Sequence, residues 1–200
     1  MRSAALVVVT ALLAACGDGG GPSTDDASAA SVESDAAEAA VRERIDAIED
    51  AVAVWRGATD VAAARAAAEE AANLIVGPNG PGYGDRDGDG VVTGETDAGL
   101  LVGVDGTPDG IADPLASNEC VARDVLAGTV DDPAAAWSEM ESAIAAWTPG
   151  RNTMPSLASH PMRIVGWATF TIAGDDLDLA HEYAGHAQLH VDVSRNALDC

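Results

Sequence analysis

The residues best suited to chemistry lie close together at positions 85–97. Asp85, Asp87 and Asp89 alternate with other residues, and Gly90 follows directly. Alternating carboxylates let one tight loop turn several oxygens toward a single hard cation, and the glycine permits the sharp turn. Ca²⁺ accepts many oxygen ligands in a flexible shell, whereas the smaller Mg²⁺ gives up its waters reluctantly. The pattern therefore predicts a Ca²⁺ site, and the alternative is an acidic surface loop that holds no ion.

This stretch resembles the calcium loop of the EF-hand and dockerin families. The resemblance implies side-chain or backbone ligands at five positions: Asp85, Asp87, Asp89, Val91 and Thr93. Thr96 stands where those families carry a closing glutamate, so Glu95 or Asp97 would complete the shell. The likeness covers roughly a dozen residues, and a glycine- and proline-rich segment precedes them. It therefore implies calcium binding and not a helix–loop–helix fold.

A second acidic cluster follows at Asp105, Asp109 and Asp113. Its Asp-Gly-Ile-Ala-Asp end is similar to the calcium repeats of thrombospondin-type proteins. The carboxylates of residues 85–113 would repel one another without cations, and so long a loop is typical of a functional or a disordered segment. A second Ca²⁺ ion and a second cluster without an ion both remain open.

Histidines near the end of the chain form another candidate site. His186 and His190 are four residues apart, and Glu182 precedes His186 by one helical turn on the same face. Such a stripe can offer a carboxylate and two imidazoles to a transition metal, with His160 as a further ligand from a neighbouring helix. The zinc-protease motif is His-Glu-x-x-His. After His181 and Glu182 it would require a histidine at position 185, where this chain has Gly185, so the motif is absent. The alternative is a set of core histidines without metal.

The N-terminus carries an export pattern. Arg2 precedes a short apolar run at 4–12, which is too short to cross a bilayer as a helix. The following Leu13-Ala14-Ala15-Cys16 resembles the bacterial lipobox. The resemblance implies a signal peptide over residues 1–15, a lipidated Cys16 and a protein held on the extracytoplasmic side of the cell envelope. An ordinary cleaved signal is the alternative.

Composition restricts the partners and the redox environment. Residues 16–34 are small, polar and acidic, which predicts a flexible tether. A net charge of −23 without any lysine makes nucleic acid an unsuitable partner. If Cys16 carries lipid, Cys120 and Cys200 remain, and an oxidising compartment favours a disulfide between them over two free thiols.

The rest of the chain predicts an all-α domain over residues 35–200. Apolar periodicity, caps and stop residues indicate helices at 36–56, 60–76, 114–126, 133–147, 161–173 and 176–197, with Asp35, Asp132 and Asp175 among the N-caps. Short connections favour an antiparallel helical bundle of four long helices with one or two short ones. The acidic loop at 85–113 would be an insertion between the second and third helices.

These patterns lead to one expected function and one alternative. The first is a lipid-anchored, exported protein that binds Ca²⁺ in an EF-hand-like loop, where the ion is mainly structural. The alternative is an envelope protein that binds a transition metal through Glu182, His186, His190 and His160. The sequence contains no set of nucleophile, base and orienting residue, so we expect no enzymatic activity.

Overall fold

The computed structural model describes residues 24–200, so the predicted signal peptide and Cys16 lie outside the described residues. The prediction of an all-α fold is confirmed, because these residues form helices and no β-strand, with one isolated bridge between Thr148 and Arg151. The α-helices are α1 (Thr24–Arg56), α2 (Val61–Val76), α3 (Pro133–Ala145), α4 (His160–Ala173) and α5 (Leu177–Asn196). Three short helices are η1 (Asp113–Leu115), η2 (Val121–Leu126) and η3 (Met154–Ser156).

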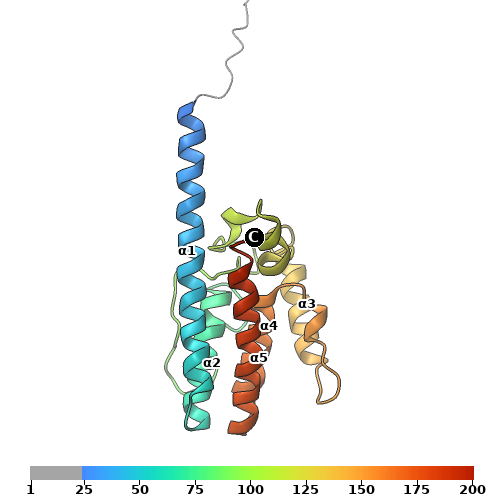
Figure 1. The fold of residues 1–200 in the computed structure, drawn as a ribbon. Helices are drawn as coiled ribbons and strands as arrows, with labels where there is room; N and C mark the ends of the chain where they lie inside the picture. The colour runs from blue at the N-terminus through green and yellow to red at the C-terminus, as the bar shows by residue number, and fades with distance from the viewer. Residues whose placement is uncertain (1–23) are drawn as a thin grey trace, which may run out of the picture.

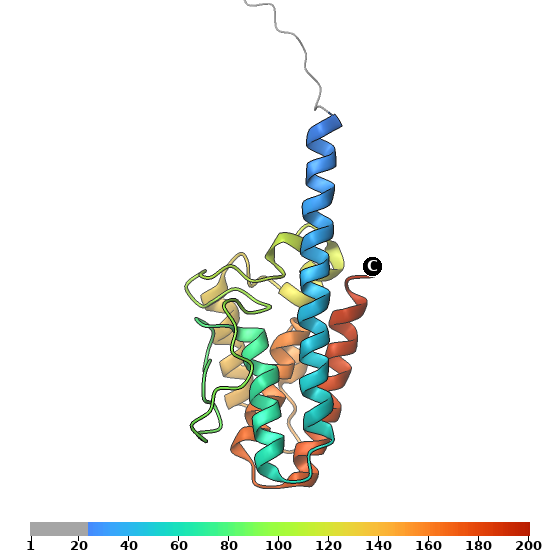
Figure 2. The same cartoon turned by 90° about the vertical axis from the view of Figure 1, so that its left-hand side faces the viewer.

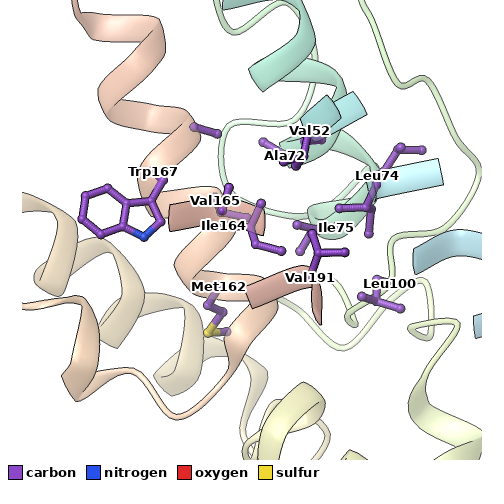
Figure 3. Packing of buried hydrophobic residues seen from close by; sticks show 14 of the residues in the cluster. Val52, Ala72, Leu74, Ile75, Leu100, Met162, Ile164, Val165, Trp167 and Val191 are labelled. Atoms are coloured by element: carbon purple, nitrogen blue, oxygen red, sulfur yellow. The ribbon is translucent and has the colours of Figure 1, made fainter. Parts of the chain in front are cut away.

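Four long helices pack against one another to form the core. Helix α1 packs on α2 and α5, and α4 packs on α2 and α5, while the N-terminal part of α1 projects beyond the others (Figures 1 and 2). Val52, Ile75, Val165 and Val191 bring one fully buried side chain from each of these helices into the same apolar cluster (Figure 3). Leu100 from the long loop of residues 77–112 joins this cluster, so the core also fixes the loop at a point well inside it.

Side-chain caps explain where several helices begin. The carboxylate of Asp60 accepts a hydrogen bond from the amide of Ala63 and starts α2, and Asp132 does the same for α3 through Ala135. Ser159 caps α4, and Asp176 caps α5. The cap of α5 was therefore predicted one residue too early, at Asp175.

Two segments differ from the predicted elements. Helix α1 begins at Thr24, so residues 24–34 of the predicted tether are helical; this stretch contains neither glycine nor proline, the two residues that most disfavour a helix. The predicted helix at 114–126 is instead a 3₁₀ turn followed by the π-helix η2. Asn118 interrupts it, because its side-chain oxygen accepts hydrogen bonds from the amides of Cys120 and Val121.

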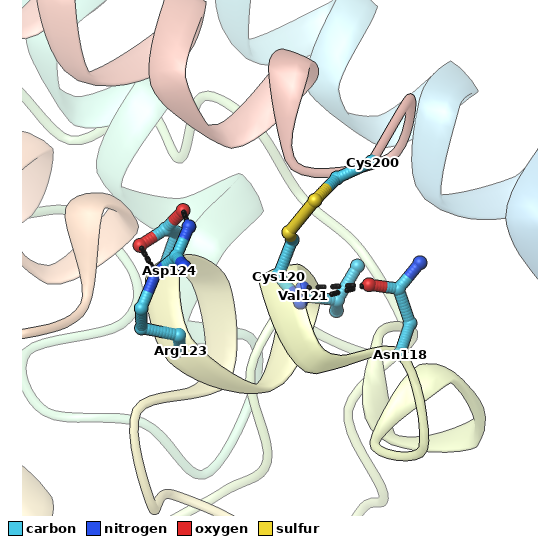
Figure 4. Close-up of a disulfide and its surroundings, with 6 residues drawn as sticks. All are labelled: Asn118, Cys120, Val121, Arg123, Asp124 and Cys200. Atoms are coloured by element: carbon cyan, nitrogen blue, oxygen red, sulfur yellow. Dashed lines mark hydrogen bonds and ion pairs between the residues drawn. A yellow bond between two sulfur atoms is a disulfide. The ribbon is translucent and has the colours of Figure 1, made fainter.

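A disulfide joins the last residue of the chain to the start of η2. The Cα atoms of Cys120 and Cys200 lie 6.1 Å apart, and the two cysteines are 80 residues apart in the sequence (Figure 4). The predicted pairing is thus present. Beside it, the guanidinium of Arg42 on α1 donates to Asp199, which adds a second link between the chain end and the core helices.

No helix among residues 24–200 combines the length and the apolar character that a transmembrane span requires.

Candidate metal centre

The acidic loop lies along one side of α2 (Figure 2). Two polar side chains of that helix hold it there. Glu69 and Asn73 are four residues apart on that helix, so they share a face. Both are fully buried, at 1% and 0% exposure, among alanines and branched apolar residues. Charged residues are rarely buried so deeply without partners. The loop supplies those partners.

Glu69 accepts hydrogen bonds from both arms of the loop. Its Oε2 receives the backbone amides of Arg86 at 2.5 Å and Asp87 at 3.0 Å. Its Oε1 receives the amide of Thr93 at 2.8 Å and the hydroxyl of the same residue at 3.0 Å. One carboxylate therefore closes residues 86–93 into a ring.

Asn73 repeats this arrangement one helical turn later. Its amide nitrogen donates to the carbonyls of Gly84 and Thr93, and its oxygen accepts the amide of Gly84. The hydroxyl of Tyr83 donates a hydrogen bond to the carbonyl of Thr96 and accepts one from the amide of the same residue. These bonds draw the two arms together on either side of the acidic residues.

The loop's own backbone orients Asp85 and Asp87. Asp85 accepts the amides of Gly88 and Gly90 through its two oxygens, and Asp87 accepts the amide of Asp89. Each carboxylate oxygen has two lone pairs, so these bonds leave sites on the same oxygens for a cation.

The structure brings three carboxylates together. One oxygen each from Glu69, Asp85 and Asp87 lies within 4.8 Å of the others, and this is the sole such group of histidine, cysteine or acidic ligands among the described residues. Glu69 is buried, Asp87 is half-buried and Asp85 is exposed. The cluster can hold a metal ion.

The electrostatics of Asp87 reflect this crowding. Partial burial raises the pKa of its carboxyl above the ordinary value of 3.8, and the charges of Asp89, Glu69 and Asp85 raise it further. The amide of Asp89 opposes these effects by bonding to the ionised form. A cation beside Asp87 would reverse the balance and favour the ionised carboxylate.

The other predicted ligands lie outside the carboxylate group. Asp89 and Glu95 are exposed, as is Asp97. Val91 is 58% exposed. The hydroxyl of Thr93 lies within hydrogen-bond distance of both Glu69 and the carbonyl of Ala66, between which its single proton is shared, so it holds the loop on α2.

The second acidic cluster does not gather around one point. Its members Asp105, Asp109 and Asp113 are absent from the carboxylate group of the described residues. Asp105 accepts the amide and hydroxyl of Thr107, which lower the pKa of its carboxyl. Asp113 accepts the amide of Gly110 through Oδ2, while burial raises the pKa of its carboxyl.

The histidine stripe is divided between two environments. His190 turns toward His160, and their Nδ1 atoms lie 3.1 Å apart. His186 instead stacks on Trp167 at 4.6 Å between ring centroids, with Glu182 at 3.9 Å. The four predicted transition-metal ligands therefore do not meet within the described part of the chain as one group.

Sequence reasoning missed Glu69 and Asn73, although a signal was present. The helix that carries them is otherwise composed almost entirely of alanine and branched apolar residues on its buried face. Polar residues at i and i+4 on such a face require buried partners.

Comparison of the chain with family models, with curated proteins and with solved structures finds no match.

Proposed function

We propose that this is an exported calcium-binding protein in which the ion fixes the loop of residues 85–93 on helix α2. The observation that carries the proposal is the convergence of Glu69, Asp85 and Asp87. Asp85 and Asp87 would supply ligand oxygens. All four hydrogen bonds to Glu69 come from the loop, so Glu69 would position the loop and add negative charge beside the ion.

The ligand chemistry favours Ca²⁺ over other cations. The group contains only carboxylate oxygens, which suit hard cations better than Cu²⁺ or Zn²⁺, ions that favour nitrogen and sulfur ligands. It lies in a loop with an Asp-x-Asp-x-Asp-Gly pattern, and such loops bind Ca²⁺ in a flexible shell with additional backbone and water oxygens. Mg²⁺ demands a stricter octahedral shell and would bind more weakly.

The same charges explain a structural role for the ion. Carboxylates within 4.8 Å of each other repel, and the exposure of Asp85 to solvent screens only part of that repulsion. A divalent cation converts that repulsion into attraction. We therefore expect Ca²⁺ to stabilise the folded chain by tying the loop to the core.

The experiment that tests the proposal is thermal unfolding of the full-length protein in non-ionic detergent. At a Ca²⁺ concentration 100 times the Kd, binding adds about 2.7 kcal/mol of stability. For a chain of this size that raises the midpoint by about 5–10 °C relative to chelator. Asp87→Asn should abolish the rise, whereas Asp109→Asn should retain it.

An unchanged midpoint in millimolar Ca²⁺, or an equal rise in the Asp87→Asn variant, would overturn the proposal. Mg²⁺ at the same concentration gives the comparison for selectivity. The lipid anchor has a separate test, since Cys16→Ala should release the protein from membranes without altering the Ca²⁺-dependent midpoint. Retention of that variant on membranes would contradict anchoring through Cys16.

A second candidate function rests on the His160–His190 pair. Two neutral imidazoles at 3.1 Å can both reach one borderline metal ion, because two ligands of a tetrahedral Zn²⁺ lie about 3.3 Å apart. Zn²⁺ binding by this pair should vanish with His190→Ala and persist with Asp87→Asn. Zn²⁺ binding that survives His190→Ala would exclude the pair as the site.

A further inference from the structure

Arg86 occupies the second position of the calcium loop, between Asp85 and Asp87. Its backbone amide donates to Glu69. Its side chain lines a separate cavity of about 270 Å³ between the loop, α3 and α4. The cavity is lined by Pro81, Gly82, Arg86, Met140, Glu141, Ile144, Ala145 and Thr169. Apart from Arg86, Glu141 and Thr169, this lining has no polar side chain.

The guanidinium of Arg86 is largely buried without a matching acceptor. Its Nη1 atom is inaccessible to solvent and has no hydrogen-bond partner. Arg86 also takes no part in the ion pairs formed by the described residues. A guanidinium remains charged at all ordinary pH values, so burial cannot be relieved by loss of a proton.

The other partly buried arginines differ from Arg86. Arg44 donates to the carbonyls of Leu74 and Ala98. Arg65 donates to the carbonyl of Gly174, and Arg163 to that of Leu157. Burial lowers the pKa of Arg86, and the charge of Glu69 opposes that effect. Arg86 is therefore a partly desolvated cation that has an unpaired donor and whose side chain lines a cavity.

We propose that this cavity binds a small monocarboxylate whose carboxylate pairs with Arg86 and whose apolar part contacts Met140 and Ile144. A guanidinium presents parallel N–H groups that match a carboxylate in a two-point contact. The volume lies just below the range typical of sites for larger ligands, so a compact molecule fits best.

The surrounding charges favour a monoanion over a phosphate. Arg86 is the only cationic side chain in the lining, and Glu141 adds a negative charge. The chain as a whole carries −23, which repels a dianion more strongly than a monoanion. Physiological salt screens the distant part of that repulsion, and the contact with Arg86 is screened less.

Benzoate is a suitable probe, because it combines a planar carboxylate with a compact apolar ring. We would titrate the full-length protein in non-ionic detergent and follow the arginine Nε–Hε signals by ¹⁵N NMR at constant ionic strength. One arginine signal should shift in a saturable manner, with a Kd of about 1 mM or tighter. That signal should be missing in Arg86→Met, and the other arginine signals should then not respond.

The neutral isostere benzamide and two further variants control the experiment. Benzamide should bind at least tenfold more weakly than benzoate, and Arg86→Lys should weaken benzoate because the two-point contact is lost. Arg65→Met, which removes a guanidinium already bonded to Gly174, should bind benzoate as the wild type does.

Equal binding of benzoate and benzamide by the wild type would overturn the proposal, and this comparison needs no variant to fold. Unchanged benzoate binding by a folded Arg86→Met variant would overturn it as well. So would a response that never saturates. Because benzoate binding can be measured in chelator, without any Ca²⁺, the result is separable from the test of the calcium site.

Discussion

Glu69 and Thr93 are 24 residues apart, yet the carboxylate of Glu69 accepts both the amide and the hydroxyl of Thr93. The opposite oxygen of Glu69 accepts the amides of Arg86 and Asp87. A single buried side chain on α2 therefore sets the distance between the two arms of the acidic loop. The position of Asp85 and Asp87 beside each other depends on this contact.

The first prediction concerns Glu69→Gln. A glutamine directs an NH₂ group toward loop amides that need an acceptor, so at least one buried donor loses its partner. We expect a loss of about 2–4 kcal/mol in the free energy of unfolding, measured with urea in the presence of chelator. Glu70→Gln is the matched control and should change stability by less than about 0.5 kcal/mol. Similar losses for both variants would contradict the assigned contact.

The second prediction is a pH dependence of Ca²⁺ affinity. The pKa of Asp87 is raised above 3.8, because burial and neighbouring carboxylates disfavour its ionised form. Protons should therefore displace Ca²⁺ as the pH falls through this raised pKa. Without Ca²⁺, the free energy of unfolding should instead increase as the pH falls through the same window, because the folded state binds the proton on Asp87 more tightly than the unfolded state does. Titrations across pH 7 to 4 check both, and an affinity independent of pH would contradict the role of Asp87.

The third prediction concerns acid stability through His190. Burial, followed by the charges of His160, Arg163 and His186, lowers the pKa of His190 from 6.5 to about 3. The unfolded chain therefore binds a proton that the folded chain does not, and stability falls as the pH drops below 6.5 toward about 3. His190→Asn should flatten the pH dependence of the thermal midpoint in this window. An unchanged slope in the variant would show that another group governs it.

The fourth prediction concerns the disulfide. Cross-linking Cys120 to Cys200 closes a long loop, which restricts the unfolded chain and stabilises the protein by about 4 kcal/mol in the entropic model. Reduction should lower the urea midpoint accordingly. The double variant Cys120→Ser with Cys200→Ser should show the lower midpoint from the start and no response to reductant. A variant that still responds to reductant would indicate a different pairing.

The fifth prediction links the two proposed sites and rests on both of them. Arg86 lies between Asp85 and Asp87 in the chain, so Ca²⁺ would fix its backbone and offset nearby negative charge. Benzoate should therefore bind at least threefold more tightly in Ca²⁺ than in chelator. Saturating benzoate should raise the affinity for Ca²⁺ by the same factor. Equal benzoate affinities in both conditions would show that the sites are independent.

Much of the helical structure could be predicted from local patterns. Asp132 caps the helix that follows it, as expected from a polar residue before apolar periodicity, whereas Asp60, predicted as the first helical residue, is the N-cap of α2. The segment at 114–126 could not be predicted in this way, because Asn118 bonds to the backbone and redirects the chain. The start of α1 was missed because the sequence of its first turns is mostly polar and lacks the apolar periodicity by which helices were predicted.

The candidate site was predicted in part. The spacing of the carboxylates alone predicts Asp85 and Asp87 as ligands. Glu69 lies on the preceding helix α2, and only the tertiary fold brings it to the site. The histidine stripe shows the opposite case. His186 and His190 share a helix face, but the neighbouring side chains Trp167 and His160 direct them to different partners.

The most direct test of the central claim is a calorimetric titration of the chelator-treated, full-length protein with Ca²⁺. The geometry predicts one ion per chain, with binding in the micromolar to millimolar range. Combining Asp85→Asn with Asp87→Asn should abolish the heat, and combining Asp105→Asn with Asp109→Asn should preserve it. Absence of binding up to several millimolar Ca²⁺, or binding that survives loss of Asp85 and Asp87, would contradict a calcium site between the loop and α2.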